Sequence, residues 1–267
     1  MKYGFLGTGK MASAIIAGMT LSGYNSNDIL GFNKSNEKID KLVADYGIGK
    51  CNSQKELIAT SDVLFLAVKP SVLDEIIEDV KSNLSNKNIL IISIAVGKTL
   101  SYFEEHLDKN NKIVRVMPNI NSTALASTSG YCFNSNVSIG DIKVIEDVFG
   151  SIGTIEQVKE DLFSIFAAIA GSSPAFTYMY IDALAAAAVK AGMPKKQALK
   201  IAANTVKGSS IALLNSDKHP CDLIDDVCSP NGTTIEGVSS LKINCFEGVI
   251  SEGIDAILKK DKAIKEG

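Results

Sequence analysis

The stretch Gly7-Thr8-Gly9-Lys10-Met11-Ala12 decides the fold of the N-terminal half, because of what lies on either side of it. A short apolar run covers residues 3–6 before it, and a helical pattern covers residues 12–19 after it. At such a strand-to-helix junction, a G-x-G-x-x-A pattern predicts a dinucleotide site. The first glycine permits a tight turn, the second lets the backbone approach a pyrophosphate, and the small alanine lets helix and strand pack closely.

Short β-branched runs alternate with amphipathic stretches from residue 2 to about residue 158, which is typical of βαβ units. Several runs are almost continuously apolar, as strands covered on both faces must be. They predict strands over residues 3–6, 29–33, 63–68, 89–94 and 113–117. We therefore predict an α/β fold with a doubly wound, Rossmann-type parallel sheet in residues 1–159.

From residue 160 onward every apolar segment has helical spacing or composition, so residues 160–267 are predicted to form an all-helical second domain. Ser173 and Pro174 indicate the start of one long helix, and Gly192 indicates its end. That helix is apolar on nearly all faces and has no side suited to solvent. We expect a second subunit to cover it; packing by neighbouring helices of the same chain is the alternative.

The composition is that of an ordinary globular protein, with 267 residues, 46% hydrophobic, 21% charged and a net charge of −3. Nucleic acid is therefore not an expected partner. The N-terminus runs straight into a strand pattern, and the apolar segment 175–191 is mostly alanine and interrupted by Asp182. We expect neither a secretion signal nor a membrane span. Five scattered cysteines predict reduced thiols in the cytoplasm and no metal site.

The residues Asn33-Lys34-Ser35 follow the second predicted strand, where an NAD enzyme normally places an acidic side chain on the ribose hydroxyls. A carboxylate would repel a 2′-phosphate, whereas an amide, an ammonium and a hydroxyl can all bind it. We therefore predict NADP(H) as the cofactor, with NAD(H) as an accepted alternative. The competing interpretation is that Lys34 is simply a solvated loop residue.

Few residues suggest acid–base or nucleophilic chemistry. His106 is expected at the surface, and His219 either caps a helix or approaches a site. Patterns typical of hydrolases, kinases and zinc proteases do not occur. One polar turn remains, Cys228-Ser229-Pro230-Asn231-Gly232-Thr233-Thr234, and it opens a helix. Its hydroxyls and free N–H groups suit a carboxylate, although a plain helix cap would have the same pattern.

Several stretches resemble one known family over essentially the whole chain: Gly4-Phe5-Leu6-Gly7-Thr8-Gly9 with Met11-Ala12, Asp62-Val63-Leu64-Phe65-Leu66-Ala67-Val68-Lys69-Pro70, Arg115-Val116-Met117-Pro118-Asn119, Gly171-Ser172-Ser173-Pro174-Ala175-Phe176, Lys190-Ala191-Gly192-Met193-Pro194, His219-Pro220 and the segment 228–237. The chain resembles pyrroline-5-carboxylate reductases, oxidoreductases that convert 1-pyrroline-5-carboxylate to L-proline with NADPH in the last step of proline biosynthesis. The segment 228–237 is the most specific match. The resemblance implies an NADP-binding domain at residues 1–159, a dimerisation and substrate domain at residues 160–267, a homodimer or higher oligomer, and an active site where the two domains meet.

The same resemblance implies which residues act. The cofactor should lie along Leu6, Gly7, Thr8, Gly9, Lys10, Met11, Asn33, Ala67, Val68, Lys69, Pro70, Ile94, Ala95 and Val96, with Asn119 near the nicotinamide. The carboxylate of the small-molecule substrate should be held by Ser229, Gly232, Thr233 and Thr234, with Asp217 beside the substrate. Thr234 is the candidate catalytic residue, as a proton relay to the ring nitrogen.

Two departures from the family pattern bear on the substrate. Residues 120–127 replace the Gly-Glu-Gly element that usually follows the Met-Pro-Asn segment, and Asn231 replaces a more frequent glycine. Asparagine also tolerates a positive φ, so the second change is mild. Two alternatives therefore stay open: a reductase of a different small imine or keto acid, and a non-enzymatic NADPH-binding protein.

Overall fold

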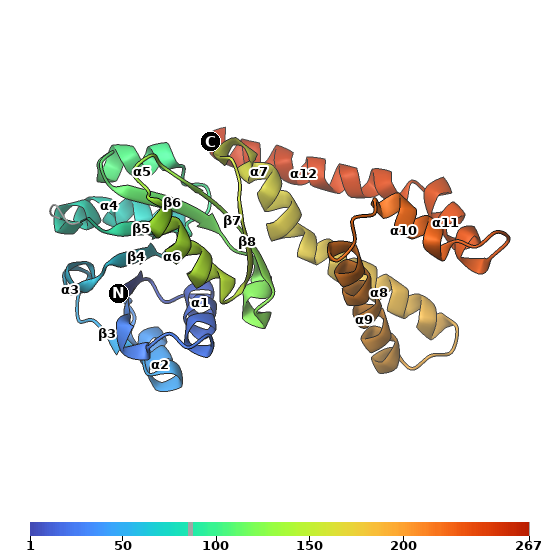
Figure 1. Ribbon diagram of the computed structural model, residues 1–267, viewed down its shortest axis with the longest axis horizontal. Coiled ribbons are helices and arrows are strands. Elements are labelled where there is room, and N and C mark those ends of the chain that lie inside the picture. Colours follow the sequence, from blue (N-terminus) through green and yellow to red (C-terminus); the bar gives the residue numbers. More distant parts are fainter. Residues whose placement is uncertain (85–87, 267) are drawn as a thin grey trace. The chain divides into compact units, whose positions relative to one another are not determined.

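The computed structural model describes residues 1–84 and 88–266, and it divides into two compact units, Met1–Gly171 and Ser172–Gly267 (Figure 1). The N-terminal unit is an α/β domain and the C-terminal unit is helical, as predicted. The predicted domain boundary after residue 159 precedes the division between the units by one short helical segment, residues 160–171.

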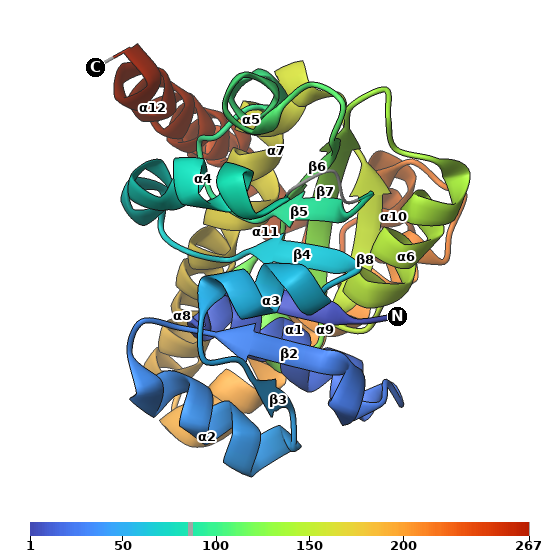
Figure 2. The same cartoon turned by 90° about the vertical axis from the view of Figure 1, so that its left-hand side faces the viewer.

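The N-terminal unit is built on one sheet with the strand order β3-β2-β1-β4-β5-β6-β7-β8 (Figure 2). All five predicted strands are confirmed, and β3, β7 and β8 were not predicted. The sheet is mainly parallel, as predicted; the exception lies at one end, where β7 runs antiparallel to β6 and β8 runs parallel to β7. The strands are β1 (Tyr3–Leu6), β2 (Ile29–Phe32), β3 (Gly49–Lys50), β4 (Val63–Leu66), β5 (Leu90–Ser93), β6 (Lys112–Met117), β7 (Ser127–Phe133) and β8 (Gly153–Gln157).

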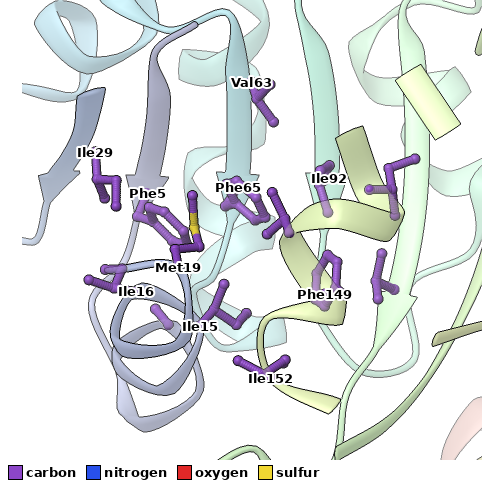
Figure 3. Packing of buried hydrophobic residues seen from close by; sticks show 14 of the residues in the cluster. Phe5, Ile15, Ile16, Met19, Ile29, Val63, Phe65, Ile92, Phe149 and Ile152 are labelled. Carbon is purple, nitrogen blue, oxygen red and sulfur yellow. The ribbon is translucent and has the colours of Figure 1, made fainter. Parts of the chain in front are cut away.

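Helices cover both faces of this sheet, so the doubly wound prediction is confirmed. On one face, buried side chains of α1, α2 and α6 pack against β1, β2 and β4; Figure 3 shows Phe5 beside Met19 of α1, and Phe65 between Phe5 and Phe149 of α6. The rings of Phe5 and Phe65 stack with centroids 4.3 Å apart. On the other face lie α3, α4 and α5. The helices are α1 (Lys10–Leu21), η1 (Ser26–Asp28), α2 (Asn36–Tyr46), α3 (Gln54–Thr60), α4 (Pro70–Leu84), α5 (Leu100–Leu107), η2 (Ile120–Ala124) and α6 (Ile139–Gly150).

Arg115 ties the segment after β8 to the sheet. Its guanidinium lies 3.0 Å from a carboxylate oxygen of Glu160 and 4.4 Å from the ring centre of Phe163. The same Glu160 oxygen accepts a hydrogen bond from the backbone N–H of Leu100, at 2.7 Å. One ion pair therefore joins β6, the start of α5 and the short helical segment formed by η3 (Glu160–Leu162), α7 (Phe163–Phe166) and η4 (Ala167–Ser172).

The C-terminal unit consists of helices alone among its described residues: α8 (Ser173–Lys190), α9 (Lys195–Leu214), α10 (Pro220–Val227), α11 (Thr233–Ile243) and α12 (Phe246–Glu266). Helix α8 begins at Ser173, as predicted, with Pro174 in its first turn; its N-cap residue is Ser172 and not Ser173. The turn after α8 places Gly192 at a φ of +98°, as expected of a residue following a helix end.

Helix α8 is not buried within the single chain, which agrees with the expectation that a second subunit covers it. Ala185 is its buried residue, whereas Tyr178 and Met179 are 59% and 71% exposed. Neighbouring helices of the chain therefore do not suffice to cover it. By length and composition alone the segment Glu160–Lys190 passes as a possible membrane span, which is weak evidence because core helices of soluble proteins pass equally.

Candidate functional site

The carboxyl ends of four parallel strands meet at one edge of the sheet. Leu6, the last residue of β1, is paired with Phe32 of β2 and with Leu66 of β4, and Leu66 is paired with Ser93 of β5. Hydrogen bonds carry this alignment into the loops, since the Gly7 N–H donates to the Phe32 carbonyl at 2.9 Å. The loops predicted to line the cofactor therefore lie at the same edge, where open α/β sheets bind their ligands.

The two glycines of the first loop have different surroundings. Gly7 has a φ of +97°, and an added Cβ would lie 2.7 Å from the Ala67 carbonyl oxygen. Gly9 has an ordinary φ of −76°, and an added Cβ would meet no atom within 4 Å. The chain's own packing therefore requires glycine at position 7, whereas at position 9 it leaves open space beside the start of α1. This space is where the fingerprint places a pyrophosphate.

Thr8, between these glycines, has a buried hydroxyl group that the protein itself leaves unpaired among the described residues. The residue is 2% exposed, and its hydroxyl has no hydrogen-bond partner among the described residues. Leaving a buried hydroxyl unpaired destabilises a fold by about 1–3 kcal/mol. The start of α1 also has no side-chain cap and no acidic residue in its first turn, so Lys10, Met11 and their neighbours present free N–H groups to an anion. These features fit a dinucleotide phosphate.

Asn33 holds the loop after β2 in place. Its amide oxygen accepts a hydrogen bond from the Thr8 N–H at 3.3 Å, and its amide nitrogen donates to the Ser35 carbonyl at 2.9 Å. Lys34 and Ser35 are exposed, and the Ser35 hydroxyl makes no capping bond to α2. Both side chains are therefore available to a 2′-phosphate, while Asn33 orients the loop that carries them.

The loops after β4 and β5 complete this edge. Ala67 donates its N–H to the Leu6 carbonyl at 2.9 Å, and Ile94 donates to Leu66 at 3.2 Å. Ala95 is 5% exposed and Val96 is 64% exposed, so the loop after β5 turns outward at Val96. The structure thus brings the predicted residues of these loops to the edge that carries Gly7 and Thr8; they are Ala67, Val68, Lys69, Pro70, Ile94, Ala95 and Val96.

Asn119 lies after β6, and its side-chain amide forms hydrogen bonds within the protein. It is 6% exposed, its amide nitrogen donates to the Ala170 carbonyl at 2.9 Å, and its amide oxygen accepts from the Asn121 N–H at 3.0 Å. The side chain therefore joins η2 to η4. The sequence alone gave no sign of this link, because Asn119 and Ala170 lie far apart along the chain.

The altered segment after Asn119 forms η2 and leads into β7 through Leu125. Leu125 has a φ of +54°, a left-handed conformation that glycine adopts more readily than leucine. Ile120 and Leu125 are 53% and 42% exposed. The segment thus keeps a glycine-like backbone while presenting apolar side chains.

The predicted carboxylate site lies in the C-terminal unit, at the start of α11. The Gly232 N–H donates to the Ser229 carbonyl at 3.0 Å across a tight turn, and Asn231 within it has a φ of +58°. Asparagine therefore supplies the backbone conformation that glycine would. Gly232 is the N-cap of α11 and no side chain caps the helix, so the first-turn N–H groups are free beside the exposed Thr233 and Thr234.

Gly232 also keeps Ser229 close to this helix start. A Cβ at position 232 would lie 2.4 Å from the Ser229 hydroxyl oxygen, so glycine leaves room for that hydroxyl. The structure therefore brings Ser229, Gly232, Thr233 and Thr234 together at one helix start.

Asp217 lies in the loop between α9 and α10 and is exposed. The next residue, Lys218, forms an ion pair of 2.6 Å with Asp226 in the last turn of α10. This pair holds the loop near the chain segment that leads to Ser229. His219 is a helix cap, because its ring Nδ1 accepts from the Cys221 N–H at 3.2 Å and its backbone N–H bonds Asp222. His106 bonds the Tyr102 carbonyl of its own helix.

Among the described residues, no group of His, Cys, Asp and Glu side chains is arranged to hold a metal ion. All five cysteines are free thiols. Burial raises the pKa of Cys132 to about 12, with Glu160 adding to the rise. Cys132 is therefore an inert thiol near neutral pH.

Family models of known proteins match a part of each unit. Residues 160–264 match the family model for pyrroline-5-carboxylate reductase dimerisation, and residues 2–97 match the model "NADP oxidoreductase coenzyme F420-dependent". The match of residues 160–264 to a dimerisation domain accounts for the exposed apolar surface of α8.

Full-length relatives carry the same family name. The chain is 35% identical to pyrroline-5-carboxylate reductase of Escherichia coli K12, over 99% of this chain and 98% of that protein. It superposes with a TM-score of 0.93 on the Coxiella burnetii enzyme, at 31% identity over 98% and 97% of the two chains. With the Plasmodium falciparum enzyme, solved with NADP bound, the TM-score is 0.86 at 32% identity, over 99% and 98%. The chain therefore belongs to the pyrroline-5-carboxylate reductase family.

Proposed function

We propose that this protein reduces 1-pyrroline-5-carboxylate to L-proline with NADPH, the last step of proline biosynthesis. The observation that carries the proposal is the similarity of nearly the whole chain to relatives named for this reaction. The described site adds to it, since an open dinucleotide edge and an uncapped helix start are what a nicotinamide cofactor and a carboxylate need.

NADPH, when bound, supplies the hydride that adds to the imine carbon. The residues that would hold its pyrophosphate lie between Leu6 and Met11, and Asn33, Lys34 and Ser35 would hold its 2′-phosphate. The loops after β4 and β5, together with Asn119, would line its other half. The chain's contribution is to bind and orient the cofactor and to exclude water from it.

The substrate is a cyclic imine with one carboxylate. Protonation of its nitrogen already makes the imine carbon electrophilic, so few acid–base residues are required. Ser229, Thr233, Thr234 and the free N–H groups after Gly232 would hold the carboxylate. The Thr234 hydroxyl would relay a proton to the ring nitrogen, with Asp217 beside the substrate.

The test is a comparison of substrates with the purified protein. We expect NADPH oxidation with 1-pyrroline-5-carboxylate at a kcat/KM well above that with six-membered cyclic imines or keto acids. Turnover confined to another imine would show that the altered segment around Leu125 has changed the substrate. Tight NADPH binding with no turnover of any imine would instead indicate a non-enzymatic protein.

Replacing Lys34 with alanine tests the assignment of the 2′-phosphate site. We expect Lys34→Ala to reduce the preference for NADPH over NADH by up to about tenfold, the equivalent of one charge-assisted contact. The measurement is kcat/KM for each cofactor at saturating substrate. Lys50→Ala is a matched control, because Lys50 pairs with Asp40 on the surface of the same domain. If the ratio of kcat/KM for NADPH to kcat/KM for NADH is unchanged in Lys34→Ala, Lys34 does not contact the 2′-phosphate and is a solvated loop residue.

The proposed working form is a homodimer or a larger ring, with α8 at the subunit contact. A cytoplasmic location remains a prediction, supported by the five free thiols.

A further inference from the structure

Two of the proposed cofactor loops are each followed directly by a helix. The loop of residues 67–70 leads into α4, and the loop of residues 94–98 leads into α5. Both helices pack on the same face of the sheet through buried side chains, among them Leu73 of α4 and Phe103 of α5. The loop of residues 94–98 has little packing of its own at its outer end, since Val96 is 64% exposed and a Cβ on Gly97 would meet no atom within 4 Å.

Three side chains join these two loop-to-helix junctions. The Lys98 ammonium lies 2.5 Å from a carboxylate oxygen of Asp74, one turn into α4. The Tyr102 hydroxyl, in the first turn of α5, donates to the same oxygen at 2.6 Å. The Lys98 nitrogen also lies 4.2 Å from the centre of the Tyr102 ring. We call Asp74, Lys98 and Tyr102 the α4–α5 clip.

The α4–α5 clip mainly fixes the position of Lys98 and of the loop before it. Lys98 is 19% exposed although its charge would be better solvated in an open loop, because Asp74 and the Tyr102 ring hold it down. The Lys98 ammonium, and next the Tyr102 hydroxyl, hold the pKa of Asp74 below its usual range. An ion pair with one partner half exposed contributes little to global stability. Its main effect is therefore local, on the position of Lys98 and the loop before it.

The order of the strands shows which part of the cofactor this loop would meet. In the proposed binding mode the 2′-phosphate of the adenosine would lie at the end of β2, and the pyrophosphate would lie at the start of α1 after β1. Strands β4 and β5 lie on the opposite side of β1 from β2. The nicotinamide half of a dinucleotide that crosses this edge would therefore lie along the loops that the clip joins.

We propose that Asp74, Lys98 and Tyr102 are positioning residues that hold the loop of residues 94–98 against α4 and thereby shape the site for the nicotinamide half of the cofactor. This inference rests on the proposed NADPH-dependent function. It does not require any of the three side chains to touch the cofactor or the substrate.

The test compares two ligands in Asp74→Asn and Tyr102→Phe. NADPH spans the whole edge, whereas adenosine 2′,5′-bisphosphate has only the adenosine and 2′-phosphate half. We expect NADPH to bind roughly fivefold more weakly to each variant, while the bisphosphate changes by less than about twofold. Isothermal titration calorimetry measures both, and circular dichroism verifies that each variant is folded.

Asp147→Asn is the control, because it removes an exposed ion pair with Lys143 on α6 and should leave both ligands unaffected. Unchanged NADPH binding in both variants, or equal weakening of both ligands, would overturn the inference. A misfolded Asp74→Asn leaves Tyr102→Phe to decide, since that change removes one hydroxyl only. Failure of the wild-type protein to bind NADPH would refute the proposed function itself.

Discussion

Replacing Gly9 with alanine is expected to abolish tight NADPH binding while leaving the fold intact. An alanine Cβ at position 9 would enter space that the protein itself leaves empty, at a φ of −76° that alanine adopts without strain. Losing glycine as the N-cap lowers the free energy of unfolding, whereas the reduced conformational freedom of the unfolded chain raises it. Each effect amounts to about 1 kcal/mol or less, so the two largely cancel. The cofactor pyrophosphate, in contrast, needs that space.

Calorimetric titration with NADPH and a thermal melt of the same sample measure the two effects. We expect a loss of affinity of at least about tenfold, equivalent to 1.4 kcal/mol, with little change in melting temperature. Gly150→Ala on α6 is a matched control, because its Cβ also meets no atom within 4 Å and should leave NADPH binding unchanged. Unchanged NADPH affinity in Gly9→Ala would contradict the assignment of the pyrophosphate site to the start of α1.

Replacing Thr234 with alanine is expected to raise the KM for 1-pyrroline-5-carboxylate by at least about tenfold, because a hydrogen bond to a charged group contributes about 1.5–3 kcal/mol. The KM for NADPH should change by less than about twofold, since the proposed cofactor residues are in the other unit. Ser229→Ala should likewise raise the KM for the substrate and leave the KM for NADPH nearly unchanged. Steady-state kinetics with each substrate varied in turn measures both constants.

Thr234→Ser retains the hydroxyl and should largely restore the substrate KM, which distinguishes a hydrogen bond from packing of the threonine methyl group. The proton-relay assignment has a separate signature. Restored KM with a low kcat in the serine variant would support carboxylate binding while requiring a different proton relay. Equal increases of both KM values in Thr234→Ala would contradict the carboxylate assignment.

The sequence predicted well the parts of the fold in which neighbouring residues carry the information. The predicted strands are short and mostly apolar runs, and the glycine loop follows one of them directly. The missed strands lack this signal. β7 begins Ser127-Thr128-Ser129-Gly130, which reads as a polar loop, and β3 has two residues. Their pairing depends on strands far along the chain, and so does the antiparallel direction of β7.

The candidate site was predicted to a similar extent. The residue types of the Gly7 to Ala12 motif and of the turn before Thr234 indicate phosphate and carboxylate binding, because the free N–H groups at a helix start favour an anion. The structural role of Asn119 could not be predicted, since its partner is the carbonyl of Ala170. The α4–α5 clip was missed for the same reason, because Asp74 and Lys98 are brought together only when α4 and α5 pack.

By itself, then, the sequence determined the alternation of strands and helices, the two helix starts that we propose bind anions, and an apolar helix α8 in need of a partner. Local periodicity and local backbone chemistry encode all three. Only the tertiary structure decided that Gly7 is closed in by Ala67 while Gly9 faces open space, and that the buried Thr8 hydroxyl has no partner among the described residues. Those distinctions arise from contacts between segments distant in sequence, and such contacts exist only once the sheet has formed.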